Sequence, residues 1–274
     1  MSEIEKDNSS WEKLNIAREE FRYPGRTIIK EVFDYFIEFH GDRLYGDDKS
    51  IIAGLAQLNN IPVTVIVQNK GIENEERKAS RYGMTLPEGY RKSLRLMKQA
   101  DKFNRPIICF VNTPGAYPGV EAEKRGQAEA IAKNICEMSN LKVPIFTVIV
   151  GEGGSGGALA LAVANRIFIM ENSVFSVVSP EACASILWRD SKQAPQAAQY
   201  LRITSGDLLD LGIIDKIIVE KGTQKEVYQR IKKTLHNFLV EYAKMTMDEI
   251  VTERKMKYRE IGKAQEDNYE CRRS

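Results

Sequence analysis

A glycine-rich segment directly after an apolar run is the feature of the sequence that most restricts the fold. Five of the seven residues at 151–157, GEGGSGG, are glycine, and they follow the strand-like run PIFTVIV at 144–150. A small-residue helix, ALALAVAN at 158–165, is expected next. Glycine inside a helix costs about 1 kcal/mol relative to alanine, so helix propensity does not explain this composition. A tight strand-to-helix turn, with its backbone close to a neighbour or a ligand, does explain it.

The rest of the chain alternates between strand and helix patterns, which favours an α/β domain with substantial parallel pairing. A polar break at Asn59 and Asn60 between the first two strands predicts an antiparallel hairpin. The expected strands are 51–58, 62–71, 106–112, 144–150, 166–172, 174–180 and 213–220. The expected helices are 27–39, 90–103, 121–139, 158–165 and 194–211, with another beginning near Pro180.

Three segments are expected along the 274 residues, a length that fits one large α/β unit with appendages. Residues 1–26 form an N-terminal helical arm, and residues 27–222 form the α/β domain. The composition becomes charged and helical after Gly222, so residues 223–274 are expected to be a helical tail that packs on the domain or on a partner.

Composition excludes several classes of protein. The 40 basic and 38 acidic residues nearly balance, which argues against nucleic-acid binding through bulk charge. No apolar run approaches the roughly 18 residues needed to span a membrane, and the N-terminus lacks a signal peptide pattern, so a cytoplasmic protein is expected. The four cysteines form no CxxC pair, and His40 and His236 have no ligand-spaced partners, so no metal site is expected.

Several interpretations of the glycine-rich segment remain open from the residues themselves. The glycines could serve only close strand-to-helix packing. A phosphate-binding loop is disfavoured because no Lys-Ser/Thr pair follows the glycines. A nucleophilic role for Ser155 is disfavoured because neither histidine has a motif context for a base. The remaining interpretation is an oxyanion site built from backbone N–H groups, each of which can contribute about 3–4 kcal/mol.

A resemblance becomes specific when six segments are taken in order over about residues 28–220. The segments are GDRLYGDD, PEGYRKSLRLMKQADKF, TPGAYPG, AEKRGQAEAIAKN, GEGGSGGALAL and SPEACASILW. Together they resemble the family of acetyl-CoA carboxylase carboxyltransferase alpha subunits.

The resemblance implies a crotonase-like fold, a spiral of ββα units with a helical C-terminal tail. It implies a biotin-dependent carboxyltransferase that moves the carboxyl group of carboxybiotin, held on the biotin carboxyl carrier protein, to acetyl-CoA. The product would be malonyl-CoA for fatty-acid synthesis. The implied partners also include biotin carboxylase and a carboxyltransferase beta subunit in an α2β2 assembly. Zinc would belong to a ribbon in the beta subunit, and no biotin would be attached to this chain.

The same resemblance implies the residues of the site. The N–H groups of Gly156 and Gly157 would stabilise the oxyanion on the biotin side, while the enolate site would come mainly from the beta subunit. The other implied residues on the carboxybiotin side are Gly115, Ala116, Gly153 and Gly154.

The sequence departs from the family pattern at two positions. Glu121 and Ala182 each stand where the family usually has glycine. These departures leave open a paralogue of a specialised pathway. A crotonase-type hydratase or decarboxylase acting on an acyl-CoA alone, and a non-catalytic assembly subunit, also remain open. The basic residues of the 72–82 loop, Arg77, Lys78 and Arg81, could attract the carrier protein or a CoA phosphate, or could simply be solvated.

Overall fold

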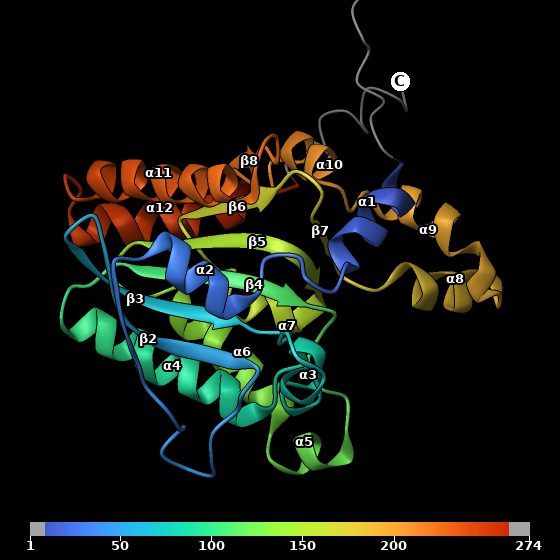
Figure 1. Cartoon of the computed structure of the whole chain (residues 1–274), viewed down its shortest axis with the longest axis horizontal. Helices are drawn as coiled ribbons and strands as arrows, with labels where there is room; N and C mark the ends of the chain where they lie inside the picture. The colour runs from blue at the N-terminus through green and yellow to red at the C-terminus, as the bar shows by residue number, and fades with distance from the viewer. Residues whose placement is uncertain (1–8, 263–274) are drawn as a thin grey trace, which may run out of the picture.

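The computed structural model describes residues 9–262, and the strands of this part form one mixed sheet (Figure 1). The strand order is β1-β2-β3-β4-β5-β6-β8, with β7 paired to the end of β5. β1, β2 and β3 pair antiparallel, whereas the pairs from β3 to β8 are parallel. The bounds are β1 Tyr35–Glu38, β2 Ile51–Leu58, β3 Ile61–Gln68, β4 Ile107–Thr113, β5 Ile145–Gly154, β6 Arg166–Met170, β7 Val174–Ser176 and β8 Lys216–Ile218.

Helices cover both faces of this sheet. Figure 1 shows α11 and α12 side by side, and α8 and α9 projecting away from the sheet near α1. No helix within residues 9–262 is long and apolar enough to cross a membrane. The α-helices are α1 Ser10–Arg18, α2 Gly25–Val32, α3 Asn74–Ala79, α4 Pro87–Lys102, α5 Val120–Lys124, α6 Gln127–Met138, α7 Ser155–Leu159, α8 Pro180–Trp188, α9 Ala194–Leu201, α10 Ser205–Asp210, α11 Gln224–Tyr242 and α12 Met247–Glu260.

The alternation of side chains along the strands divides the core into two layers. In β3, Val63, Val65 and Val67 join one apolar cluster, to which α2 and α11 also contribute. Ile66, on the opposite face, joins the second cluster with residues of α4 and α6. All seven residues of β4 are buried, as expected for a parallel strand covered on both faces. The central strands are therefore packed between apolar layers on both faces of the sheet, and this packing positions their carboxyl ends.

The predicted hairpin is confirmed. β2 and β3 pair in register from Ile51↔Gln68 to Leu58↔Ile61, with only Asn59 and Asn60 between the strands. Both asparagines have positive φ, 48° and 66°, which is the conformation of a two-residue hairpin turn. Asparagine tolerates this left-handed conformation better than other non-glycine residues.

The helix predicted at 27–39 is wrong in its second half. α2 ends at Val32, and the chain continues as the edge strand β1, paired with β2. Tyr35 and Ile37 are exposed on this edge, and Phe36 packs partly against the core. A run with apolar residues at both helical and alternate spacings fits either element, and pairing with β2 selects the strand here.

Three other segments contain shorter helices than predicted. The 121–139 helix is divided by Gly126, whose φ of 80° separates α5 from α6. The 194–211 helix is divided into α9 and α10, because Thr204 forms a new capping box with Asp207. The helix predicted at 158–165 is α7, which begins earlier, at Ser155, and ends at Leu159. In addition, α4 begins at Pro87 rather than at 90 and is preceded by the short helix α3.

A buried arginine fastens the last described helix to the domain. Arg254 of α12 is fully buried, and its guanidinium donates five hydrogen bonds. Its acceptors are Asn165 Oδ1 at 2.7 and 3.1 Å and the carbonyls of Met138 at 2.7 Å, Leu141 at 2.6 Å and Val143 at 2.6 Å. Burial lowers the pKa of Arg254 to about 10. The carbonyls belong to the end of α6 and the loop after it, where helical acceptors lack intrahelical partners.

Replacement of Arg254 should loosen this attachment. Arg254→Met keeps much of the side-chain volume but leaves buried carbonyls without donors, so we expect a loss of about 3 kcal/mol or more in the free energy of unfolding. The measurement is urea denaturation followed by circular dichroism. Arg259→Met, at an exposed position on the same helix, is the matched control. Equal stability of the two variants would contradict the anchoring role.

Candidate active site

Two strand-to-helix turns meet at one edge of the sheet. β4 ends at Thr113 and β5 ends at Gly154, and the two strands are parallel neighbours in which Thr113 pairs with Gly153. The turn after β4 continues through residues 114–116, and α7 begins at Ser155 directly after β5. Ligands of parallel sheets usually bind beyond the carboxyl ends of the strands, which is where these turns lie.

The two turns approach so closely that side chains are sterically excluded. A Cβ added to Gly154 would lie 2.1 Å from the carbonyl oxygen of Pro114. A Cβ on Gly157 would lie 2.5 Å from the nitrogen of Ala116 and 2.7 Å from the carbonyl carbon of Gly115. Because these neighbours are backbone atoms, they cannot rotate away. Close packing therefore accounts for the glycines at 154 and 157.

Gly156 is different, because packing within the chain does not require a glycine there. An added Cβ would have one neighbour within 4 Å, Ile131 Cγ2 at 3.5 Å, which is an ordinary contact. The space beside Gly156 is otherwise open. Packing within the described residues therefore gives no steric reason for glycine at this position.

The start of α7 offers backbone donors. The first N–H groups of a helix have no intrahelical acceptor, and Gly154 makes no side-chain cap. The N–H groups of Ser155, Gly156 and Gly157 occupy these first positions. Ser155 has a φ of 51°, an uncommon left-handed value for a residue with a side chain. This sharp turn is how the chain changes direction from β5 into α7.

The facing turn is held by Thr113. Its hydroxyl donates to the carbonyl of Gly115 at 2.7 Å and accepts the N–H of Gly115 at 3.1 Å. Gly115 has a φ of 152°, within the region that favours glycine. The N–H of Gly115 is thus occupied, so this residue shapes the site without presenting its own donor.

The structure brings the six residues of the sequence prediction together. Gly115 and Ala116 lie against Gly157, and Pro114, the residue before them, lies against Gly154. The space beside Gly153 is closed by β7, since its Cβ would lie 2.9 Å from the ring of Phe175. Gly156 lies on the open side of the same turn. Their roles toward a ligand remain a prediction.

An apolar groove of about 340 Å³ begins at α7. No sequence pattern predicted this groove, because its walls come from segments far apart in the chain. Tyr258 and Ile261 contribute from α12 and the residue after it, so the C-terminal tail borders the site. The groove is lined by Ser155, Gly156, Leu159, Ile167, Phe175, Ser176, Val177, Leu208, Ile213, Tyr258 and Ile261.

A charged cluster that the sequence analysis missed fixes the end of β5. Glu152 is buried, and its carboxylate forms ion pairs with Arg18 Nε and Lys70 Nζ, each at 2.8 Å. Arg18 also bonds Glu181 at 2.6 Å, so α1 of the N-terminal arm connects β5 with α8. Burial by itself would raise the pKa of Glu152, but Lys70 and Arg18 outweigh it and the pKa is lowered. The one acidic residue among five glycines was the signal in the sequence.

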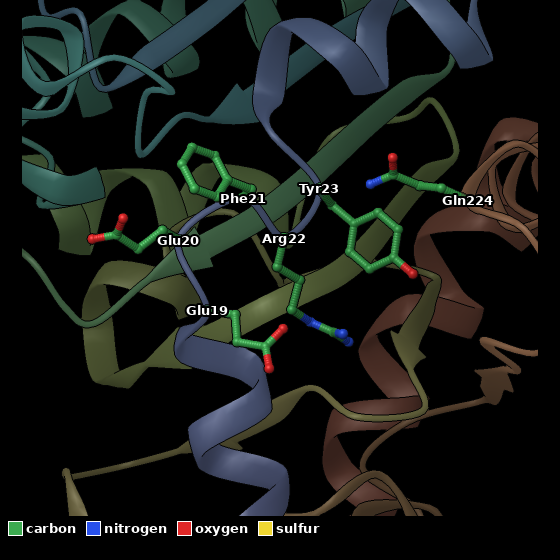
Figure 2. Close-up of a pocket in the computed structure, with 6 residues that line it drawn as sticks. All are labelled: Glu19, Glu20, Phe21, Arg22, Tyr23 and Gln224. Carbon is green, nitrogen blue, oxygen red and sulfur yellow. The ribbon is translucent and has the colours of Figure 1, made fainter.

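Other hollows have a different chemistry. A pocket of about 490 Å³ lies at the segment between α1 and α2. Figure 2 shows the residues that line it, which are Glu19, Glu20, Phe21, Arg22, Tyr23 and Gln224. This pocket is lined partly by charged side chains, and neither glycine-rich turn contributes to it. Within residues 9–262, no group of three His, Cys, Asp or Glu side chains is arranged to hold a metal ion.

The basic residues of the 72–82 segment are mostly engaged within the chain. Arg77 pairs with Glu20 at 2.5 Å, and Arg81 pairs with the buried Asp48. Lys78 is exposed. These ion pairs give the two arginines a structural role, which weakens the hypothesis that the segment attracts an acidic partner.

Solved structures with the same architecture define the class. A transcarboxylase 12S structure matches with a TM-score of 0.68 and 20% identity, covering 81% of this chain and 42% of the other. The beta subunit of geranyl-CoA carboxylase from P. aeruginosa matches at 0.65 and 19%, covering 90% and 45%. A Pseudomonas malonate decarboxylase hetero-tetramer in complex with coenzyme A matches at 0.65 and 19%, covering 84% and 91%. The chain is an α/β protein with the crotonase-like fold, as the resemblance predicted.

Sequence comparison identifies the family within this class. A family model described as acetyl co-enzyme A carboxylase carboxyltransferase-like matches residues 1–262. The acetyl-coenzyme A carboxylase carboxyl transferase subunit alpha of Clostridium botulinum (strain Eklund 17B / Type B) is 52% identical over 261 residues, covering 93% of this chain and 95% of the relative. The subunit of the same name from Bacillus velezensis is 50% identical over 277 residues, covering 97% and 84%. The chain belongs to the acetyl-CoA carboxylase carboxyltransferase alpha-subunit family.

The Glu152 cluster predicts a pH dependence of stability. Because the pKa of Glu152 is lowered in the folded protein, the unfolded state binds the proton first, and the stabilisation is lost as pH falls. Glu152→Gln should lower the free energy of unfolding by about 3 kcal/mol at pH 7. The difference in the free energy of unfolding between Glu152→Gln and wild type should become smaller below about pH 4.3, the ordinary pKa of glutamate.

The measurement is urea denaturation of both proteins between pH 3 and pH 7. Glu241→Gln, at an exposed position on α11, controls for the general effect of removing one carboxylate. A Glu152→Gln deficit that is the same at every pH would contradict the ion-pair explanation.

Proposed function

We propose that this chain is the half of a biotin-dependent carboxyltransferase that accepts carboxybiotin, carried on the biotin carboxyl carrier protein, and passes its carboxyl group to acetyl-CoA. The product is malonyl-CoA, the building block of fatty-acid synthesis. Membership of the alpha-subunit family supports the activity. The single observation that supports the place of the reaction is the open space beside Gly156 at the start of α7.

The described residues fit an anionic ligand with an apolar body. Loss of the carboxyl group from carboxybiotin leaves negative charge on the ureido oxygen of the ring. N–H groups at positions 156 and 157 are suited to this charge, because a helix start carries a partial positive charge and unpaired donors. The apolar groove that begins at Gly156 is suited to the uncharged part of the ligand.

Backbone donors suffice for this chemistry because no side chain has to act as a strong base. In the proposed reaction the ring nitrogen freed by decarboxylation takes the α-proton of acetyl-CoA, and the resulting enolate attacks carbon dioxide. This chain then needs only to stabilise charge on oxygen and to hold the ring in place. Preorganised donors contribute about 3–4 kcal/mol each to such a step. The turns that contain Gly154 and Gly157 are held by backbone contact, which provides the required rigidity.

The second half of the site is proposed to come from a beta subunit that contains the zinc ribbon and the enolate site, in a cytoplasmic α2β2 assembly served by biotin carboxylase. Large apolar side chains exposed on the projecting helices support a protein interface there. Ile186 and Leu187 on α8 are 74% and 63% exposed, and Tyr200 on α9 is 71% exposed. Contiguous exposed apolar residues mark interaction surfaces in soluble proteins.

The isolated chain should therefore be inactive. We expect no malonyl-CoA from acetyl-CoA and carboxybiotin when this chain is purified alone, and turnover when the beta subunit is added. The assay follows malonyl-CoA by mass spectrometry. Robust turnover by the isolated chain, or turnover of an acyl-CoA without biotin, would favour a self-sufficient crotonase-type enzyme instead.

Substitution at Gly156 tests the oxyanion assignment. The Cβ of Gly156→Val would have no backbone atom of another segment within 4 Å, so we expect the chain to fold and assemble. If the ligand oxygen occupies that space, a displacement on the order of 1 Å should lower kcat about 100-fold. The measurements are kcat of the reconstituted complex, thermal melting and size-exclusion chromatography.

Gly157→Val serves as the steric comparison. Its side chain would collide with the backbone of Gly115 and Ala116, so we expect a lowered melting temperature in addition to lost activity. A folded, assembled Gly156→Val complex with wild-type kcat would refute the oxyanion assignment and leave packing as the reason for these glycines.

A further inference from the structure

Two buried side chains from other elements hold the carbonyl of Gly157. Gln68, at the end of β3, donates from Nε2 to this oxygen at 3.0 Å. Tyr90, on α4, donates its hydroxyl to the same oxygen at 3.3 Å. Gln68 is 1% exposed and Tyr90 is 0% exposed. Neither residue belongs to the glycine-rich turns, and neither was singled out by the sequence.

This carbonyl is not used by the helix in the regular way. In an α-helix the carbonyl of Gly157 would accept the N–H of Leu161. Leu161 instead donates to Ala158 at 3.0 Å, because the chain tightens at the end of α7. The direction of the peptide after Gly157 is therefore set by the two side chains.

The orientation of α7 depends on such external bonds because the helix is short. α7 has five residues and few hydrogen bonds of its own, so it does not hold its axis independently. The Gly157 carbonyl belongs to the peptide that follows Gly157, whereas the N–H groups of Gly156 and Gly157 belong to the two preceding peptides. A change in the direction of this carbonyl would therefore act on those N–H groups through the backbone of the short helix. Donors in an oxyanion site lose most of their effect when they are displaced in this way.

The environment of Gln68 argues that stability is not the main reason for this residue. Its Oε1 is buried and has no hydrogen-bond partner within the described residues. An unsatisfied buried acceptor is unfavourable, and an apolar residue of similar size would remove it. Tyr90 would still provide a donor to the Gly157 carbonyl after such a replacement.

We propose that Gln68, assisted by Tyr90, is a positioning residue that fixes the direction of the Gly157 peptide and thereby aims the N–H groups at the start of α7. This rests on the proposed oxyanion role of Gly156 and Gly157. Gln68 acts through the backbone and does not touch the reacting atoms.

Gln68→Met in the reconstituted complex tests the role. The variant removes the donor and the unpaired Oε1 together at nearly constant volume. We expect kcat to fall at least about tenfold, the KM for acetyl-CoA to change less than about twofold, and the melting temperature to stay within a few degrees of wild type. A purely structural glutamine would show the reverse, with a lowered melting temperature and a kcat near wild type.

Gln127→Met is the matched control. Gln127 is also buried, donates its Nε2 to two carbonyls, those of Thr85 at 2.8 Å and Tyr117 at 3.0 Å, and leaves its Oε1 unpaired. It makes no hydrogen bond to α7. Gln127→Met should keep kcat within about twofold of the wild-type value, because it does not alter the direction of the Gly157 peptide.

Gln68→Glu adds a pH profile that a passive role would not produce. A protonated carboxyl can donate to the Gly157 carbonyl, whereas a carboxylate repels it. Burial raises the pKa of such a carboxyl, so the protonated form persists toward neutral pH. The ratio of variant to wild-type kcat should therefore fall as pH rises. A reduced ratio that is independent of pH would contradict the donor role.

Comparison with the Gly156→Val complex distinguishes failure of the proposed oxyanion site from failure of the positioning role of Gln68. If Gly156→Val is impaired while Gln68→Met has wild-type kcat, the positioning role is wrong and the oxyanion site stands. If neither variant lowers kcat in a folded complex, both are wrong. Impairment of both with intact folding, together with the pH-dependent Gln68→Glu ratio, supports the positioning role.

Discussion

Backbone-to-backbone contact between the start of α7 and the turn after β4 is the constraint on which the site depends. Gly154 and Gly157 meet Pro114, Gly115 and Ala116 at distances that leave no room for a Cβ. This contact closes one side of the turn at the start of α7. Gly156 lies on the open side, where the chain itself sets no limit on size. The same five-glycine segment thus contains residues required by packing and one that packing does not require.

Side chains from distant parts of the chain surround this contact and hold it. Glu152 fixes the end of β5 through Lys70 and Arg18, and Arg18 brings the N-terminal arm into the support of the site. Arg254 fastens α12 to carbonyls at the end of α6 and in the loop after it, and α12 in turn borders the apolar groove. The segments at the two ends of the described chain are therefore parts of the site's framework.

Much of the local structure could be predicted because it depends on neighbours in sequence. The hairpin follows from Asn59 and Asn60, which accept left-handed backbone, and the central strands follow from continuous apolar runs. The second half of the 27–39 segment could not be predicted in this way. Its apolar residues suit a helix or an edge strand equally, and only the pairing partner β2 decides between them. The division of the 121–139 helix at Gly126 had a visible signal, since glycine readily takes positive φ.

For the site, the sequence by itself determined the glycine-rich turns, the family to which they belong and the residue types able to expose backbone N–H groups. Those features follow from composition and order along the chain. Only the tertiary structure decided which glycine has a steric reason and which does not, because that depends on atoms about forty residues away. It also decided that Gln68 and Tyr90 meet at the Gly157 carbonyl, and that Tyr258 borders the groove. Such contacts cannot be predicted from spacing in the sequence, because they form where packed strands and helices bring distant residues together.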